Sequence, residues 1–224
     1  MGLLAWLVWT FVAFQVVITG NDKEPELRRG DHVLVGRWSY GLRWPFERLF
    51  GYHRSGARQP SAGDFMLFND PSDSTTSVIS GRALCVGQCM ALPGDTVWLE
   101  WHSPDDPSAV NPRRYPFVVP GKGQRVNVQP WNAALLANTL RVHEGRDYFW
   151  DGRHLRTKAG EKVVQLAFRQ DYVWAEARGM SGVYDSRVYG FVPLSHLIGR
   201  LICITYGSPF SSDRVLIPVE PFEQ

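Results

Sequence analysis

Cysteine is scarce in this sequence of 224 residues, which holds only Cys85, Cys89 and Cys203. An odd number without a C-x-x-C pair predicts neither a zinc site nor a disulfide framework. Cys85 and Cys89 would lie about 13 Å apart on a strand, too far for a disulfide. We therefore expect these two to be small, buried apolar side chains. The six histidines also lack metal-ligand spacing, so no metal and no cofactor is expected.

The sequence also lacks a large surplus of positive or negative charge. Lysine and arginine number 24 against 22 aspartates and glutamates, which gives a formal charge of +2. A nucleic-acid partner would need a concentrated basic face, and this composition gives no reason to expect one. With 44% hydrophobic residues, the chain is not a disordered tail. It can bury a core for one domain, or for one domain that carries a large insertion.

Charge is absent from the run Gly2–Ile18. As a helix rising about 1.5 Å per residue, this run would just span a bilayer. A cleaved signal peptide would need a basic start and small residues at its cleavage site, and the segment Val17–Gly20 fits that poorly. We therefore expect residues 1–20 to form one uncleaved transmembrane helix. Arg28 and Arg29 behind it favour a cytoplasmic body, but long domains cross membranes largely regardless of such charges.

Beyond residue 20 the sequence predicts mostly strands. Short runs rich in β-branched and aromatic residues recur between Gly-Asp, Asn-Asp-Pro and Pro-Gly-Asp turns, which is typical of an all-β domain. Gln129–Arg141 is the one later stretch with helical spacing of its leucines. The Pro- and Gly-rich stretch Ser103–Gly123 indicates a long excursion or an insertion. The expected strands are Asp31–Arg37, Asp64–Phe68, Arg82–Leu92, Thr96–Trp101, Val188–Pro193, Leu197–Tyr206 and Val215–Val219.

Five segments resemble, in order, the sequence boxes of the type I signal peptidases, membrane peptidases that use a serine and a lysine. Five such segments in the family's order, behind an apolar amino terminus, are hard to obtain by chance. The chain is therefore similar to a signal peptidase. The segments are GDHVLVGRWSYGLRWPF (Gly30–Phe46), GDFMLFNDP (Gly63–Pro71), GQCMALPGDTV (Gly87–Val97), YDSRVYGFVP (Tyr184–Pro193) and LIGRLICITY (Leu197–Tyr206).

This resemblance implies a mainly β fold, with a signal-peptidase-like antiparallel β core preceded by the transmembrane helix. The core would comprise residues 21–99 and 172–224. Residues 100–171 would form an inserted, non-catalytic subdomain. The resemblance also implies a single-pass protein of the inner (plasma) membrane, with its soluble domain on the periplasmic side.

The family's chemistry requires a serine that attacks the scissile carbonyl and a lysine that burial keeps neutral. In the register that the family pattern imposes, Asp22 stands at the position of the nucleophile. Gly20 stands at the position of the serine that helps to hold the oxyanion. The general-base position holds Gly87, and Gln88 replaces the arginine after it. No lysine occurs anywhere between Asp31 and Val97. The sequence therefore contains no confirmed catalytic residue.

The last box departs from the family pattern in the same direction. Val183 stands at the position of the serine that would support the lysine, whereas Asp185 and Arg187 are retained. We expect this pair to form an ion pair between two strands rather than to act in catalysis. The family-matching structural residues are Pro25, Gly30, Asp31, Pro93, Gly94, Asp95, Asp185, Ser186 and Arg187.

Two functions remain open at this point. The first is an inactive homologue that binds or scaffolds exported polypeptides or other membrane secretion proteins, with peptides added as a strand to an exposed sheet edge. The second is an active serine endopeptidase that cleaves signal peptides with an atypical dyad. We favour the first, because the base and its support are missing together. The membrane would be contacted through the amino-terminal helix, and no nucleic acid would be bound.

Overall fold

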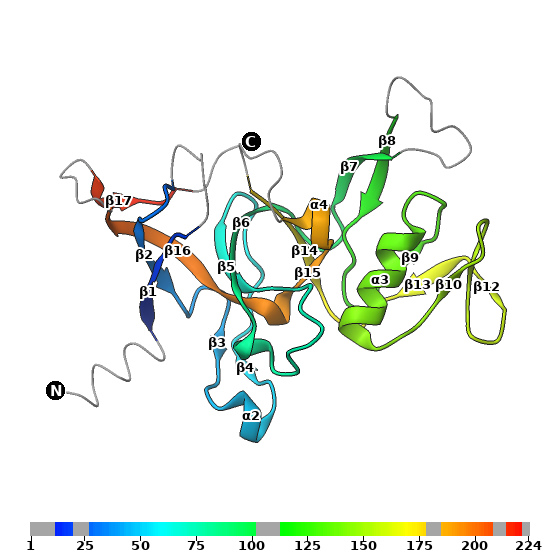
Figure 1. Cartoon of the computed structure of the whole chain (residues 1–224), viewed down its shortest axis with the longest axis horizontal. Helices are drawn as coiled ribbons and strands as arrows, with labels where there is room; N and C mark the ends of the chain where they lie inside the picture. Colours follow the sequence, from blue (N-terminus) through cyan, green and yellow to red (C-terminus); the bar gives the residue numbers. More distant parts are fainter. Residues whose placement is uncertain (1–11, 20–26, 102–112, 178–184, 208–213, 221–224) are drawn as a thin grey trace. The chain divides into compact units, whose positions relative to one another are not determined.

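The computed structural model describes residues 12–19, 27–101, 113–177, 185–207 and 214–220. The chain divides into two compact units. The first unit comprises Met1–Met90, Ala175–Tyr189 and Ser195–Gln224, and the second comprises Ala91–Trp174 and Gly190–Leu194. Strands predominate in both, and few helices are present among the described residues (Figure 1).

An antiparallel sheet forms the first unit. Its strands follow the order β1 (Ala13–Val17), β2 (His32–Gly36), β16 (Leu197–Tyr206), β5 (Phe65–Asn69) and β6 (Leu84–Ala91). The strand β17 (Val215–Pro218) pairs with β16. Four short elements, β3 (Leu42–Arg43), α2 (Glu47–Phe50), β4 (Arg54–Ser55) and η1 (Ile79–Gly81), extend from one end of this unit. The remaining short elements are α4 (Ser186–Tyr189) and η2 (Leu194–His196).

The core of the first unit explains why its sheet curls. Val33 and Val35 alternate along β2 with fully buried side chains, as a strand with one covered face requires. Phe14 and Val16 of β1 and Val86 of β6 pack against the same apolar cluster. The strands at the two ends of this five-strand order therefore share one core.

The second unit is built from small strand pairs and one helix. The helix α3 (Ala133–Glu144) buries Leu136 and Leu140 and ends at Gly145, which has φ 63°. The edge-on packing of Trp174 against Phe191, with ring centroids 5.5 Å apart, adds an aromatic core. The strands are β7 (Thr96–Trp101) with β8 (Arg113–Val118), β9 (Arg125–Asn127) with β13 (Gln165–Ala167), β10 (Phe149–Trp150) with β11 (Leu155–Arg156) and β12 (Lys162–Val163), and β14 (Tyr172–Glu176) with β15 (Val192–Pro193).

Each of the three Gly-Asp pairs in the sequence forms the same type of turn. In each, glycine has φ near +90° and the aspartate N–H donates to the carbonyl three residues earlier, as in a type II turn. The aspartate carboxylate then accepts the N–H of that same earlier residue, at 2.7 to 3.0 Å. The turns therefore start strands through local contacts. They are Gly30–Asp31 before β2, Gly63–Asp64 before β5 and Gly94–Asp95 before β7.

The left-handed conformation of the glycine in these turns leads to a testable prediction. Gly63 has φ 88°, and a side chain there costs about 1–2 kcal/mol. We expect Gly63→Ala to lower the free energy of unfolding by that amount in urea denaturation. Gly87→Ala is the matched control, because its φ lies outside the left-handed region and an added Cβ meets its nearest atom at 3.4 Å. A loss in the control as large as in Gly63→Ala would contradict the role of the turn.

The expected helix over Gly2–Ile18 is wrong where the structure describes it. Residues Ala13–Val17 form β1, which pairs antiparallel with β2 along its whole length. Among the described residues, no helix is long and apolar enough to cross a membrane. A short apolar run fits a buried strand as well as a helix, and long-range pairing decided for the strand here. Residues 1–11, the rest of the expected helix, lie outside the described part.

Two smaller expectations also need correction. The expected strand Val188–Pro193 is instead the short helix α4 followed by β15. Cys89 is buried as expected, whereas Cys85 is only partly buried. The expected helix in Gln129–Arg141 is confirmed as α3, although α3 starts four residues later.

Candidate functional site

Gly87, which we predict to stand at the position of the family's general base, lies in the middle of β6 and is buried. It pairs with Met66 of β5. A Cβ built there would meet Phe68 Cε1 at 3.4 Å, Ala175 Cβ at 3.5 Å and the Glu176 carbonyl at 3.6 Å. These are ordinary contacts, so the position can accept a side chain. It carries none, and therefore supplies no proton acceptor.

Gln88 occupies the neighbouring position with its side chain buried. Its Nε2 donates to the Gly63 carbonyl at 3.0 Å, which ties β6 to the turn that starts β5. Its Oε1 is buried and accepts no hydrogen bond from any described residue. An amide in this place holds the sheet together, but it does not replace a base.

The lysines of the chain are Lys23, Lys122, Lys158 and Lys162. The last three are exposed and belong to the second unit. A lysine that acts as a base must be kept neutral by burial, and none of these three is buried. Lys23 lies outside the described residues.

The family register also predicts that Asp22 and Gly87 face each other across a groove, and this stays a prediction. Asp22 and Gly20 lie outside the described part of the chain, and so do Pro25 and Val183. The absence of a base at Gly87 does not depend on them.

The Asp185–Arg187 pair is present, but it does not join two strands as expected. Asp185 precedes α4 and accepts the backbone N–H of Arg187 at 2.9 Å, which caps the helix start. The guanidinium pairs with the same carboxylate at 2.6 Å, and hydrogen bonding to it raises the pKa of Arg187. Asp185 also accepts the N–H of Ala177, just after β14, and Ser186 Oγ accepts the N–H of Ala175. These contacts hold α4 against the end of β14.

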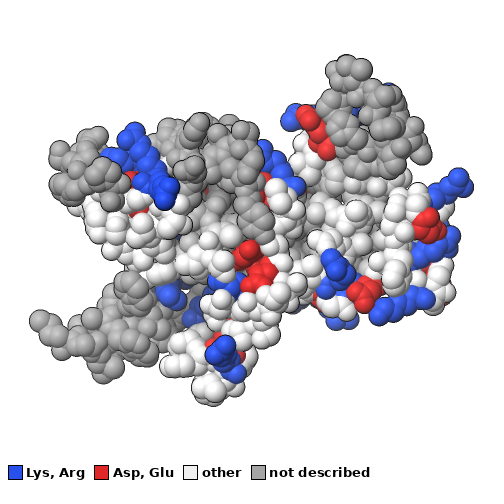
Figure 2. Space-filling view, in the orientation of Figure 1, with Lys and Arg blue, Asp and Glu red and all other residues white. Residues whose placement is uncertain are grey.

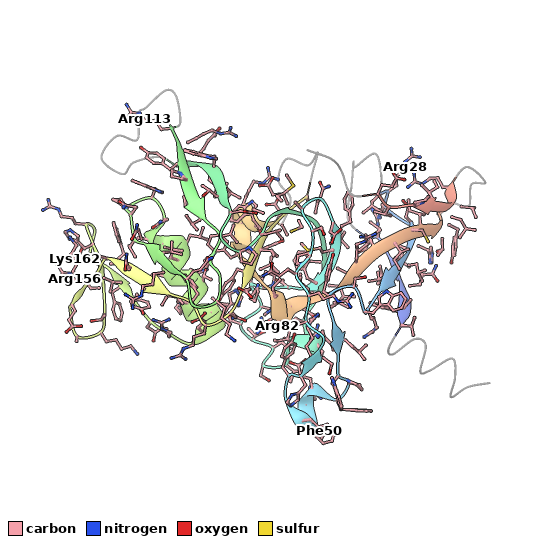
Figure 3. The ribbon with its side chains drawn as sticks, turned by 180° about the vertical axis from the view of Figure 1, so that it is seen from behind. Arg28, Phe50, Arg82, Arg113, Arg156 and Lys162 are labelled. Carbon is pink, nitrogen blue, oxygen red and sulfur yellow. The ribbon has the colours of Figure 1, made fainter. Side chains whose placement is uncertain are left out.

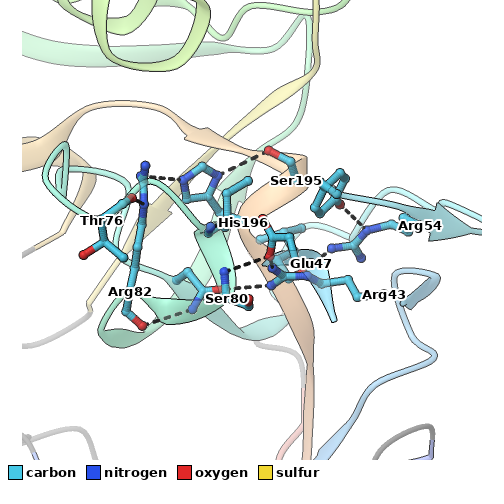
Figure 4. Close-up of polar contacts among 12 residues, drawn as sticks. Arg43, Glu47, Arg54, Thr76, Ser80, Arg82, Ser195 and His196 are labelled. Atoms are coloured by element: carbon cyan, nitrogen blue, oxygen red, sulfur yellow. Dashed lines mark hydrogen bonds and ion pairs between the residues drawn. The ribbon is translucent and has the colours of Figure 1, made fainter. Parts of the chain in front are cut away.

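Ser195 and His196 form a serine–histidine contact, with Oγ and Nδ1 3.3 Å apart. However, Arg82 Nη1 lies 3.1 Å from His196 Nε2 (Figure 4). An arginine can only donate, so Nε2 accepts and the ring proton resides on Nδ1. That proton points at the serine, which is the opposite of what a general base requires.

The outer edge of β1 is open. β1 pairs with β2 on one side, and no described strand pairs with its other side. The N–H of Ile18 and the carbonyl of Val12 bond toward β2. By antiparallel alternation, the backbone groups of Ala13, Gln15 and Val17 point to the open edge. This edge can accept an added strand.

Comparison with known families agrees with the order of the boxes. Residues 1–206 match the family described as "Signal peptidase, peptidase S26". The chain therefore belongs to the signal peptidase family.

Similarity to individual proteins supports this assignment. Over 88 residues, or 39% of this chain, it is 31% identical to the signal peptidase I of Pseudomonas fluorescens and 30% identical to that of Pseudomonas aeruginosa. Over 100 residues, or 45% of this chain, it is 25% identical to the signal peptidase I of Buchnera aphidicola subsp. Acyrthosiphon pisum. The matched region spans only 28% to 29% of the length of these curated relatives.

Proposed function

We propose that this protein is a catalytically degenerate signal peptidase homologue that binds extended polypeptides without cleaving them. The observation that carries the proposal is the absence of a base at Gly87, together with the exposure of all three described lysines. Among the described residues, no hydrogen bond joins a serine to any of these lysines. The alternative, an active serine peptidase with an atypical dyad, needs such a contact or an equivalent one. The Ser195–His196 contact does not supply it, because the proton lies on the wrong atom.

The proposed binding mode is strand addition at the outer edge of β1. Main-chain hydrogen bonds to the outward groups of this strand would give affinity, and the apolar cluster beneath it would favour small or apolar side chains. An edge strand with an apolar face beneath it is the kind of surface that takes up an added strand.

We further propose the setting in which this binding takes place. The protein acts on the extracytoplasmic side of a bacterial inner membrane, and its partners are exported polypeptides or membrane proteins of secretion. Residues 100–171 form a non-catalytic insertion between core segments 21–99 and 172–224. Family membership supports the setting, and the box order supports the division.

Substitution of Val17 tests the edge. Val17→Pro removes an outward N–H while leaving the hydrogen bonds to β2 in place, since proline is tolerated on edge strands. We expect a synthetic signal peptide to bind the wild-type chain and to lose at least about tenfold in affinity to this variant. Fluorescence anisotropy of a labelled peptide measures the effect.

Val17→Thr is the control, because it keeps the backbone N–H and the β-branched shape. It should bind the peptide like the wild type. Equal binding by the proline variant would exclude the edge of β1, and a wild-type chain that binds no signal peptide would refute the proposed function.

A further inference from the structure

A cavity of about 260 Å³ lies in the first unit, beside the segment that carries α2. We call it the Arg37 pocket. Phe14 of β1 and Leu84 of β6 both line it. Its other walls include Arg37, Arg43, Trp44 and Glu47.

Arg37 is a cation without a counter-charge. Its guanidinium lies over the Phe14 ring, 4.3 Å from the centroid. Its Nε is buried, and the group makes no hydrogen bond or ion pair to any described residue. A guanidinium has five N–H donors in a planar fork, and leaving the buried Nε–H without a partner is costly.

Arg43 has two partners, of which one is neutral and one is charged. Its Nη1 donates to Asn69 Oδ1 at 2.7 Å, and its Nη2 lies 3.4 Å from Glu47 Oε2. Glu47 also accepts the backbone N–H groups of Ile79 and Ser80, each at 3.0 Å (Figure 4). Its one negative charge is therefore already shared among several donors.

The pocket carries two arginines and one carboxylate, a surplus of one positive charge. Burial lowers the pKa of both guanidinium groups, and the charge of Arg37 adds to the lowering at Arg43. Both shifts have the sign that burial of a cation produces.

The wall formed by the α2 segment is exposed and apolar. Trp44 and Phe46 are 60% and 58% exposed, although both line the pocket. Phe50 lies at the far end of the same segment, and the surface there is mostly uncharged (Figures 2 and 3). Phe46 has φ 64°, which is unusual for a bulky residue and holds the turn before α2 in a strained shape. The mouth of the pocket is thus lined by side chains that a ligand would cover.

The position of the pocket relates it to the proposed peptide site. Phe14 belongs to β1, the strand with the open edge. An extended polypeptide added at the open edge of β1 would pass beside Phe14 and so reach the wall of the pocket.

We propose that the Arg37 pocket binds the carboxylate of one acidic side chain in the bound polypeptide. This inference rests on the proposed function and adds a preference to it. One carboxylate neutralises the single surplus charge, and its two oxygens match the fork of an unpaired guanidinium. Glu47 already occupies the same pocket as a carboxylate held by an arginine, which shows that this chemistry fits there.

Paired peptides test the preference. The probes are acetylated, amidated nonapeptides of alanine and valine, each with one glutamate at a successive position, and a twin with glutamine there. Binding to the purified full chain is measured by calorimetry. We expect one glutamate position to bind at least about tenfold more tightly than its twin, as two charged hydrogen bonds allow. The gain should shrink as salt rises.

Variants of Arg37 test whether the gain in affinity from glutamate arises in the Arg37 pocket. Arg37→Gln should abolish it, and Arg37→Lys, which keeps the charge but not the fork, should reduce it. Arg125→Gln is the matched control, because Arg125 is exposed on β9 of the second unit and should leave the gain unchanged. Circular dichroism checks folding. If Arg37→Gln does not fold, Arg37→Lys carries the test.

The outcomes separate this inference from the proposed function. Peptides that bind without any gain from glutamate would overturn the carboxylate site alone. A gain that survives both Arg37 variants would place the site elsewhere and overturn it too. Competition by inorganic phosphate that exceeds competition by acetate at equal ionic strength would overturn the choice of carboxylate. If no peptide binds, both proposals fail.

Discussion

Incubation of the purified chain with a standard preprotein is expected to release no mature product, while an active signal peptidase run beside it converts the preprotein. General-base assistance alone contributes about 10²-fold to 10⁴-fold to such a reaction, and one oxyanion donor about 10²-fold to 10³-fold. Gly87 supplies no base, and in the proposed register Gly20 stands at the position of the family's oxyanion serine. With both missing, little acceleration is left to measure.

Restoring the two reacting groups is not expected to restore cleavage. In Asp22→Ser with Gly87→Lys, the new lysine would start among Phe68, Ala175 and the Glu176 carbonyl. Its family support would be Val183 instead of a hydroxyl. A lysine without that support does not hold the lowered pKa that a base needs.

Gel analysis of preprotein conversion measures both results. Gly87→Ala is the control for disturbance of β6, and it should be as inactive as the wild type. Specific cleavage at the signal junction by the wild-type chain, abolished by replacing a single serine, would overturn the degenerate assignment and identify the nucleophile.

Removal of Arg214 is expected to destabilise the first unit strongly. Its guanidinium forms a buried, doubly hydrogen-bonded ion pair with Asp31, whose side chain is 2% exposed. This pair joins the turn before β2 to the start of β17. Arg214→Met leaves the carboxylate buried without its partner, which costs about 3–5 kcal/mol. Urea denaturation followed by circular dichroism measures the loss.

An exposed pair in the second unit is the matched control. Lys158 and Asp147 form an ion pair at 3.0 Å with side chains 72% and 42% exposed, and Lys158→Met should cost less than about 1 kcal/mol. Asp31→Asn combined with Arg214→Met should recover much of the loss, because asparagine is neutral and still accepts the Arg28 N–H. A double variant as unstable as Arg214→Met would show that the buried charge is not the cause.

Local features of the chain were readable without the structure. The Gly-Asp turns depend on glycine in a left-handed conformation and on a carboxylate that reaches back three residues, so their sequence predicts them. The strands that follow Asp31 and Asp64 are confirmed as β2 and β5. The missing lysine is likewise a property of residue identity, since no arrangement in space turns Gly87 into a base.

Long-range contacts decided the features of the structure that the sequence did not predict. The apolar run around Ala13–Val17 suits a helix or a buried strand equally, and only its pairing with β2 made it a strand. His196 became a hydrogen-bond acceptor through Arg82, which is 114 residues away in sequence. Arg37 follows a strand with no pattern to mark it, and its lack of a counter-charge appears only when β1, β6 and the α2 segment enclose it. The sequence by itself determined which groups the protein has and which turns it makes. The tertiary structure decided which of those groups meet, because such contacts depend on pairings between residues far apart in the chain.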